Sequence, residues 1–194
     1  MEHLHDSERE GVMPGQSKPI LVVIDIQKEY VTEGRPYFIN DIEPSLDRAR
    51  AVLAAARADG WEVVHVRHLQ EGDIFGSTSA YSEFVAGFEP IDGEADFVKG
   101  DYSCYSSPEF ARTMKDKIGR SIYVIGYGST KCCLATIIDG YHRGQKFYFV
   151  FDASNAKRTD RFDEHSLHEH ATDILRSYCT VVGSDTAVET GRQL

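Results

Sequence analysis

Apolar residues along this chain gather in short runs that alternate with segments of helical spacing. The first run, "ILVVIDI", is unbroken and rich in β-branched residues, which is typical of a strand buried on both faces of a parallel sheet. Later runs such as "WEVVHVRHL" and "KFYFVFDAS" have the same character. Strands are therefore expected at 20–26, 61–69, 95–100, 121–128, 146–154 and 179–184.

The segments between these runs carry helix signals. In the first, apolar residues recur at helical spacing between a possible cap at Asn40 or Asp41 and a stop at Gly60. Ser107 and Pro108 mark a second helix start. Helices are expected within 40–60, 106–119, 129–144 and 163–178, with short ones within 79–88 and 185–194.

Strict alternation of strands and helices predicts an α/β domain with three layers, in which helices cover both faces of a mainly parallel sheet. We expect a polar, flexible arm at 1–18 and one domain at 19–194. In such folds functional groups collect at the carboxyl ends of the strands. No glycine-rich phosphate-binding motif follows the first strand, so the sequence does not indicate a dinucleotide or P-loop site.

Composition narrows the class of partner. Of 194 residues, 21 are Lys or Arg and 31 are Asp or Glu, a net charge of −10, which argues against nucleic acid or an anionic membrane. Four cysteines are too few for a disulfide framework in a chain of this length. No signal-like segment or long apolar run is visible, so we expect a cytoplasmic protein.

Three reactive groups stand where predicted strands end. Asp25 closes the first strand, Lys99 closes the third, and the fourth runs through "GYG" towards the adjacent Cys132 and Cys133. Because the ends of parallel strands meet at one edge of the sheet, an acid, an ammonium and a thiol are expected to converge there. This combination favours covalent catalysis.

The two adjacent thiols are predicted to differ in role. On a helix with 100° per residue, Cys132 lies opposite an apolar stripe centred near Tyr141, whereas Cys133 aligns with Gly140 and Gly144. Cys133 is therefore interpreted as a compact packing residue. Cys132 is interpreted as the nucleophile, with a pKa lowered from about 8.5 by the helix start. A redox pair, a zinc site and two simple core thiols are the alternatives.

Three segments together resemble the isochorismatase-like cysteine hydrolases. "ILVVIDIQKEY" is similar to that family's opening D-x-Q-x-x-F/Y, and "FVKGDYSCY" resembles its lysine segment. "VIGYGSTKCCLATIIDGYHRGQKFYFVFDAS" resembles its core signature. The signature positions are Gly126, Ser129, Cys132, Thr136, Asp139, Gly144 and Asp152-Ala153.

The resemblance implies a sheet of order 3-2-1-4-5-6 and an Asp–Lys–Cys triad. In it, Asp25 takes the thiol proton, Lys99 stabilises the charges and Cys132 attacks. A cis peptide between Tyr127 and Gly128 is implied, with the backbone N–H groups of Gly128 and Cys132 forming an oxyanion hole. It also implies a homo-oligomer, a dimer or tetramer.

Substrate contacts are expected from Tyr30, by the motif, and from His68, at the active edge of the second strand. Tyr105 and Tyr127, together with Tyr102 and Phe75, are candidates for an aromatic wall facing a small planar substrate. For each of these aromatic residues, packing in the core is the other interpretation.

The chain departs from the metal-dependent members of the family. Their D-x-H after the second strand is absent from "HVRHLQEGDIFG", so we expect neither a metal nor another cofactor. Lys131, beside the nucleophile, could add positive potential or face solvent. The complete triad favours hydrolysis of a C–N bond in a small amide or carbamoyl compound. The alternatives are isochorismatase-type cleavage of a vinyl ether and a non-catalytic binding protein with this fold.

Overall fold

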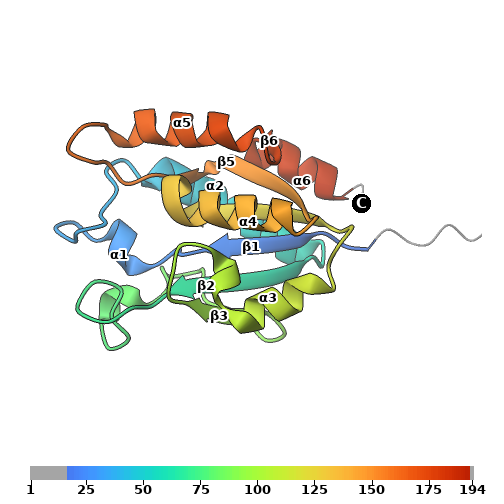
Figure 1. The fold of residues 1–194 in the computed structure, drawn as a ribbon, viewed down its shortest axis with the longest axis horizontal. Helices are drawn as coiled ribbons and strands as arrows, with labels where there is room; N and C mark the ends of the chain where they lie inside the picture. Colours follow the sequence, from blue (N-terminus) through green and yellow to red (C-terminus); the bar gives the residue numbers. More distant parts are fainter. Residues whose placement is uncertain (1–16, 193–194) are drawn as a thin grey trace, which may run out of the picture.

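A computed structural model describes residues 17–192, and its sheet has six strands that all run parallel, in the order β3-β2-β1-β4-β5-β6 (Figure 1). The strands are β1 (Ile20–Ile24), β2 (Glu62–His68), β3 (Ala95–Lys99), β4 (Ser121–Tyr127), β5 (Lys146–Asn155) and β6 (Thr180–Val182). The predicted fold class and strand order are confirmed. The predicted arm, apart from residues 17 and 18, lies outside the described residues.

The helices follow the predicted alternation. They are α1 (Lys28–Val31), α2 (Glu43–Ala58), α3 (Pro108–Lys115), α4 (Leu134–His142), α5 (Glu164–Leu175) and α6 (Ser184–Arg192). Three short turns complete the set: 3₁₀ turns at Ala80–Ser82 and Cys104–Ser106, and a π-helical turn at Ser129–Cys133. Sequence spacing did not predict α1 or the π-helical turn, because each is too short to show a period.

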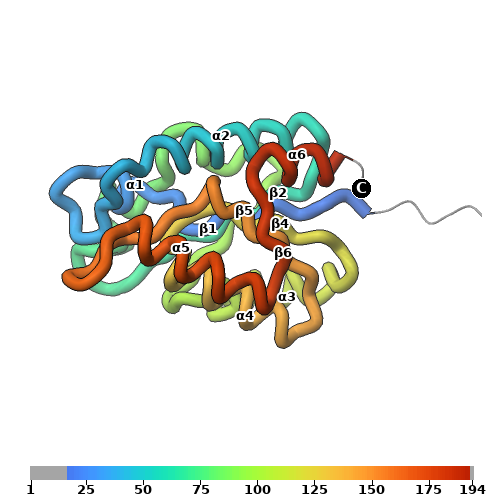
Figure 2. Tube along the Cα trace, turned by 90° about the horizontal axis from the view of Figure 1, so that it is seen from above, coloured from blue at the N-terminus to red at the C-terminus, as the bar shows by residue number. Residues whose placement is uncertain are grey.

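Helices cover both faces of the sheet. In Figure 2, α2 and α6 lie on one side of the strands, and α3 and α4 lie on the other. The alternating residues of β1 divide accordingly: Leu21 and Val23 belong to the core under α2, whereas Val22 and Ile24 belong to the core under α3 and α4. Burial on both faces explains why the first strand is an unbroken apolar run.

The buried side of α4 differs from the predicted stripe. Tyr141, the expected centre of that stripe, is 48% exposed, while Ile137 is fully buried. Gly140 allows the close approach, because a Cβ there would lie 2.2 Å from Cε2 of Phe147. The preceding π-helical turn also breaks the uniform 100° spacing on which the prediction rested. Cys133 is fully buried, as expected for a packing residue.

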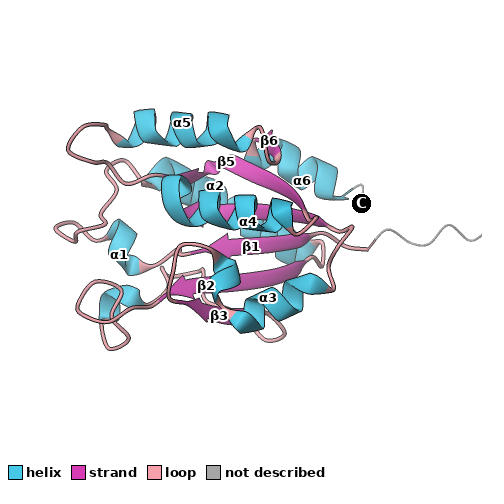
Figure 3. Cartoon of the chain, viewed as in Figure 1, coloured by secondary structure: helices cyan, strands magenta, loops and turns pink. Residues whose placement is uncertain are grey.

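The strands end on the side of the molecule where α1 and several connecting loops gather (Figure 3). A bulge in the pairing of β4 with β5 lies between Val124 and Gly126. Bulges commonly redirect a strand near a functional site. In the described part of the chain, no helix is both long enough and apolar enough to cross a lipid bilayer.

Gly126→Ala is expected to lower the free energy of unfolding by about 2–5 kcal/mol. Gly126 has a φ of 130°, and an added Cβ would lie 1.9 Å from the carbonyl oxygen of Ile24. Chemical denaturation measures the loss. Gly60→Ala is the control, because Gly60 has a φ of 69° but no atom within 4 Å of the added Cβ. Equal losses in the two variants would show that the contact with Ile24 is unimportant.

Candidate active site

Asp25 directly follows the end of β1. Its N–H donates to the carbonyl of Val66 over 2.9 Å, which keeps the residue paired with β2. Its φ is 52°, a left-handed conformation unusual for a residue with a side chain. Such conformations cost on the order of 1–3 kcal/mol and cluster at functional sites. The carboxylate is completely buried.

Lys99 connects the acid to the thiol. It is 1% exposed, and its Nζ lies 2.9 Å from Oδ2 of Asp25 and 3.3 Å from Sγ of Cys132. Nζ also donates to the carbonyl of Asp101. Burial by itself lowers the pKa of Lys99, but the carboxylate of Asp25 outweighs this effect and raises the pKa above its usual value. The ammonium therefore stays charged between the two groups.

The contact between Lys99 and Asp25 is an ion pair rather than a well-aligned hydrogen bond. In residues 17–192, neither carboxylate oxygen of Asp25 has a hydrogen-bond partner of good geometry. An oxygen is therefore left to accept a proton. The structure thus brings the three predicted catalytic side chains into one buried cluster.

Cys132 lies in the π-helical turn that precedes α4 and is 5% exposed. Burial raises the pKa of this thiol and the nearby Asp25 carboxylate raises it further, while Lys99 opposes the change. The sequence predicted a lowered pKa from the helix start alone. That expectation was wrong, because loss of water around the sulfur dominates. Formation of the thiolate therefore requires a base, and Asp25 is adjacent.

Cys132 forms part of the wall of a pocket of about 220 Å³. The remaining lining is mostly aromatic or polar: Tyr30, Tyr37, His68, Gln70, Phe75, Gly100, Asp101, Tyr102 and Lys131. Phe75 lies 5.4 Å from Tyr30 and 5.0 Å from Tyr37, measured between ring centroids. The volume is below the usual range for drug-sized ligands, so the pocket suits a small molecule.

Two predicted substrate contacts, Tyr30 and His68, line this pocket. His68 also supports the lysine, since its Nδ1 lies 3.4 Å from Nζ of Lys99 and its Nε2 lies 3.0 Å from Oε1 of Gln70. Because an ammonium can only donate, Nδ1 is the acceptor and Nε2 carries the proton. His68 therefore accepts from Lys99 and donates to Gln70 at the pocket wall.

Tyr105 and Tyr127 are not among the residues that line the pocket. Tyr105 packs against Phe110 in the core under α3, with ring centroids 5.1 Å apart. Tyr127 is fully buried in the other core, and its hydroxyl lies 3.2 Å from the Ser45 hydroxyl. Both rings are packing residues, which corrects the predicted aromatic wall. The aromatic residues that line the pocket are Tyr30 and Tyr37, together with the expected Phe75 and Tyr102.

Gln27 is a site residue that the sequence analysis left unassigned. Its buried amide donates to the carbonyls of His68 and Ser82, over 3.0 and 2.7 Å, and accepts from the N–H of His68. It therefore joins the end of β2 to the 3₁₀ turn at Ala80–Ser82. The sequence signal that could have identified Gln27 was its position in the segment "DIQ", two residues after Asp25.

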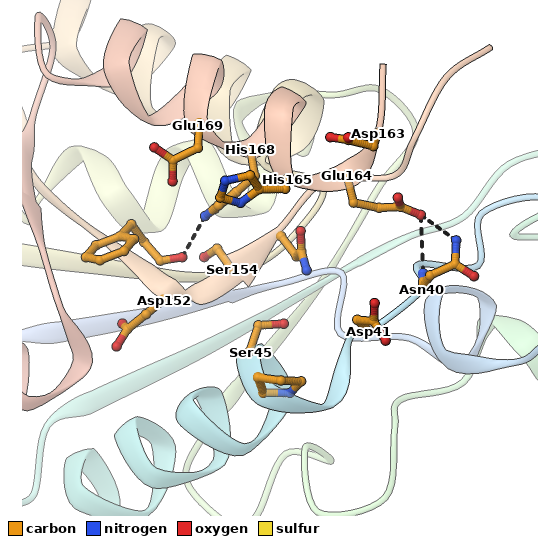
Figure 4. A pocket seen from close by; sticks show the side chains of 13 residues that line it. Asn40, Asp41, Ser45, Asp152, Ser154, Asp163, Glu164, His165, His168 and Glu169 are labelled. Carbon is orange, nitrogen blue, oxygen red and sulfur yellow. Dashed lines mark hydrogen bonds between the residues drawn. The ribbon is translucent and has the colours of Figure 1, made fainter. Parts of the chain in front are cut away.

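His168, on α5, is a buried residue to which the sequence analysis gave no role. Its Nδ1 lies 2.9 Å from the Ser129 hydroxyl and its Nε2 lies 2.9 Å from the carbonyl of Phe151, a contact visible in Figure 4. Burial lowers the pKa of His168. The neutral ring ties α5 to the turn that carries Cys132. Helical spacing with Ala171 and Leu175, also buried, was the missed signal.

Two other signature residues have structural contacts. The Thr136 hydroxyl accepts from the N–H of Cys104, and Asp139 accepts from the Ser103 hydroxyl over 2.9 Å. These two hydrogen bonds hold the segment that follows Lys99 against α4. The peptide between Tyr127 and Gly128 is cis, as the resemblance implies.

A larger cavity of about 580 Å³ lies between α5, the end of β5 and the start of α2 (Figure 4). It contains several carboxylates, among them Asp152, Glu164 and Glu169, but neither Cys132 nor Lys99. The smaller pocket is therefore the candidate active site. Within residues 17–192, no three His, Cys, Asp or Glu side chains are grouped so that they could hold a metal ion.

Comparison with known proteins identifies the family of this chain. A family model described as the isochorismatase domain matches residues 19–186. YddQ, an uncharacterized isochorismatase family protein of Bacillus subtilis, is 27% identical over 136 residues, which cover 69% of this chain and 75% of that protein. The maleamate amidohydrolase of Pseudomonas putida is 23% identical, over 91% of this chain and 88% of that enzyme.

A solved isochorismatase structure from Pseudomonas putida KT2440 has the same fold. Its TM-score is 0.79 at 23% identity, and the match covers 90% of this chain and 92% of that one. Since the family model spans most of the sequence and the strand order agrees with the one that the resemblance implied, this chain belongs to the isochorismatase family of hydrolases.

Proposed function

We propose that the protein is a cysteine hydrolase that cleaves a C–N bond in a small amide or carbamoyl compound. The observation that carries this proposal is the position of the Lys99 Nζ, 2.9 Å from Asp25 and 3.3 Å from the sulfur of Cys132, beside a small pocket. A nucleophile, a base and a fixed cation are the groups that acyl transfer requires. The similarity to a maleamate amidohydrolase also favours this chemistry.

In the first half-reaction, Asp25 takes the thiol proton while the sulfur of Cys132 attacks the carbonyl carbon. The oxyanion that forms is stabilised by the backbone N–H groups of Gly128 and Cys132, and loss of one such donor typically costs on the order of 10²–10³ in rate. Collapse of this intermediate breaks the C–N bond. The leaving nitrogen takes the proton from Asp25, and a thioester remains on Cys132.

In the second half-reaction, Asp25 removes a proton from water, which attacks the thioester. Breaking the C–S bond releases the acid product, and the sulfur of Cys132 recovers its proton from Asp25. Lys99 remains positively charged throughout, because its pKa is raised by the carboxylate. Its role is to offset the negative charge that moves between the acid and the sulfur.

Ammonia release from a panel of primary amides and carbamoyl compounds tests the proposal. At least one compound is expected to give turnover that disappears in Cys132→Ala. Isochorismate is assayed in parallel. Isochorismate turnover without ammonia release from any amide would overturn C–N hydrolysis in favour of vinyl-ether cleavage. If Cys132→Ala kept the activity of the wild type, the cysteine would have no part in the mechanism.

A further inference from the structure

Two lysines share one aromatic ring at the candidate active site. Lys131 directly precedes the nucleophile, and its Nζ lies 5.4 Å from the ring centre of Tyr37 and 5.6 Å from that of Tyr102. Lys157 follows β5, far away in sequence, and its Nζ also lies 5.4 Å from the ring centre of Tyr37. Cation–π contacts of this kind hold an ammonium in place but leave its charge uncompensated.

Among the residues that the structure describes, neither of these lysines has a carboxylate partner. In residues 17–192, no Asp or Glu oxygen lies within the 4 Å that defines an ion pair for Lys131 or Lys157. Lys28 and Lys117, by contrast, each form such a pair. Other lysines, such as Lys115 and Lys146, also lie outside ion pairs with residues 17–192, but Lys131 and Lys157 are distinguished by lying at the same Tyr37 ring and lining the same cavity. Since neighbouring cations repel each other, a bound anion would stabilise this arrangement.

The two lysines line a cavity that shares wall residues with the pocket of the thiol. Lys131 and Tyr37 line both the pocket that contains Cys132 and a neighbouring cavity of about 460 Å³. That cavity is also lined by Lys157 and Arg158, with Asp160 as its one acidic lining residue. A small molecule whose carbonyl lies at Cys132 therefore has a positively charged region on one side.

We propose that Lys131 and Lys157 bind a carboxylate of the substrate, so that the preferred substrates are short amides or carbamoyl compounds bearing a carboxylate away from the scissile C–N bond. This inference rests on the proposed function, because it names the substrate class for Cys132. It gives Lys131 a role in specificity rather than in packing. A lysine suits this role because its compact charge attracts a carboxylate without requiring one fixed orientation.

The experiment compares the monoamide of succinic acid, which has a free carboxylate, with the neutral diamide of the same acid. The measured kcat/KM of the diamide is first halved, because that compound has two equivalent amides. The wild-type kcat/KM of the monoamide is expected to be at least about 10-fold higher than this corrected value. Lys131→Gln is expected to lower kcat/KM for the monoamide about 10- to 100-fold more than for the diamide, mainly through KM. Lys157→Gln should change the ratio in the same direction.

Lys146→Gln is the matched control. Lys146 lies 5.2 Å from the ring centre of Tyr148 and lines neither cavity, so its loss should leave the ratio unchanged. A wild-type ratio near one, or an equal loss for both substrates in Lys131→Gln, would overturn the inference while leaving the proposed hydrolysis intact.

If no amide is hydrolysed, the proposed function fails separately. Calorimetric binding of the same two compounds to Cys132→Ser then measures the preference directly. Tighter binding of the monoamide, lost in the double variant with Lys131→Gln, supports the carboxylate site. Equal or undetectable binding of the two compounds overturns it.

Discussion

Replacing Cys132 by alanine is expected to reduce kcat/KM by at least about 10⁴-fold, because the thioester cannot form without the sulfur. Serine at the same position should be almost as inactive, because its hydroxyl is far less acidic than a thiol. Ammonia release with the best amide of the panel is the measurement. The fold should survive both changes, since the side chains are of similar or smaller size.

Cys133→Ala is the matched control for this result. Cys133 is adjacent in sequence and fully buried, but it is part of the core under α4 and does not line the pocket. Its replacement should cost about 1–2 kcal/mol of stability through a small cavity and keep most of the turnover. If Cys133→Ala were the inactive variant, the nucleophile would be wrongly assigned.

Asp25→Asn is expected to lower kcat/KM by about 10²–10⁴-fold, because an amide cannot accept the thiol proton. It should also lower the free energy of unfolding by about 3–5 kcal/mol, because Lys99 is left as a buried ammonium without its carboxylate. Steady-state kinetics and chemical denaturation measure the two effects separately.

The double variant Asp25→Asn with Lys99→Met separates catalysis from stability. Removing both charges eliminates the unpaired ammonium, so stability should recover relative to Asp25→Asn alone. Activity should remain lost. A double variant that regained activity would show that Asp25 acts only by supporting the fold, and an unchanged stability in the single variant would mean that the ion pair contributes little.

Much of the site was predictable because short motifs are tied to strand ends. Asp25 and Lys99 each close a recognisable apolar run, and the carboxyl ends of parallel strands must lie at one edge. Periodicity also predicted that Cys133 packs in the core, and Cys133 is fully buried. It failed for Tyr141, because the π-helical turn and the close packing of Gly140 changed which side of α4 faces the sheet.

The residues that were missed or misplaced depend on long-range contacts. Gln27 contacts Ser82 across 55 positions of sequence, and His168 contacts Ser129 across 39. Tyr105 and Tyr127 are aromatic residues near the site in sequence, but neighbouring side chains place them in the core. A single sequence carries no signal that distinguishes an aromatic ring in a pocket wall from one in the core.

The sequence by itself determined the alternation of strands and helices, the parallel sheet and the acid, ammonium and thiol that stand at the strand ends, because these follow from local periodicity and from motifs at strand ends. Only the tertiary structure decided the charge state and surroundings of those residues. The raised thiol pKa of Cys132 arises from burial. That Lys131 and Lys157 lie at an aromatic ring and, within residues 17–192, form no ion pair depends on which groups lie nearby in space. Burial and distance are properties of the folded chain, and no local pattern encodes them.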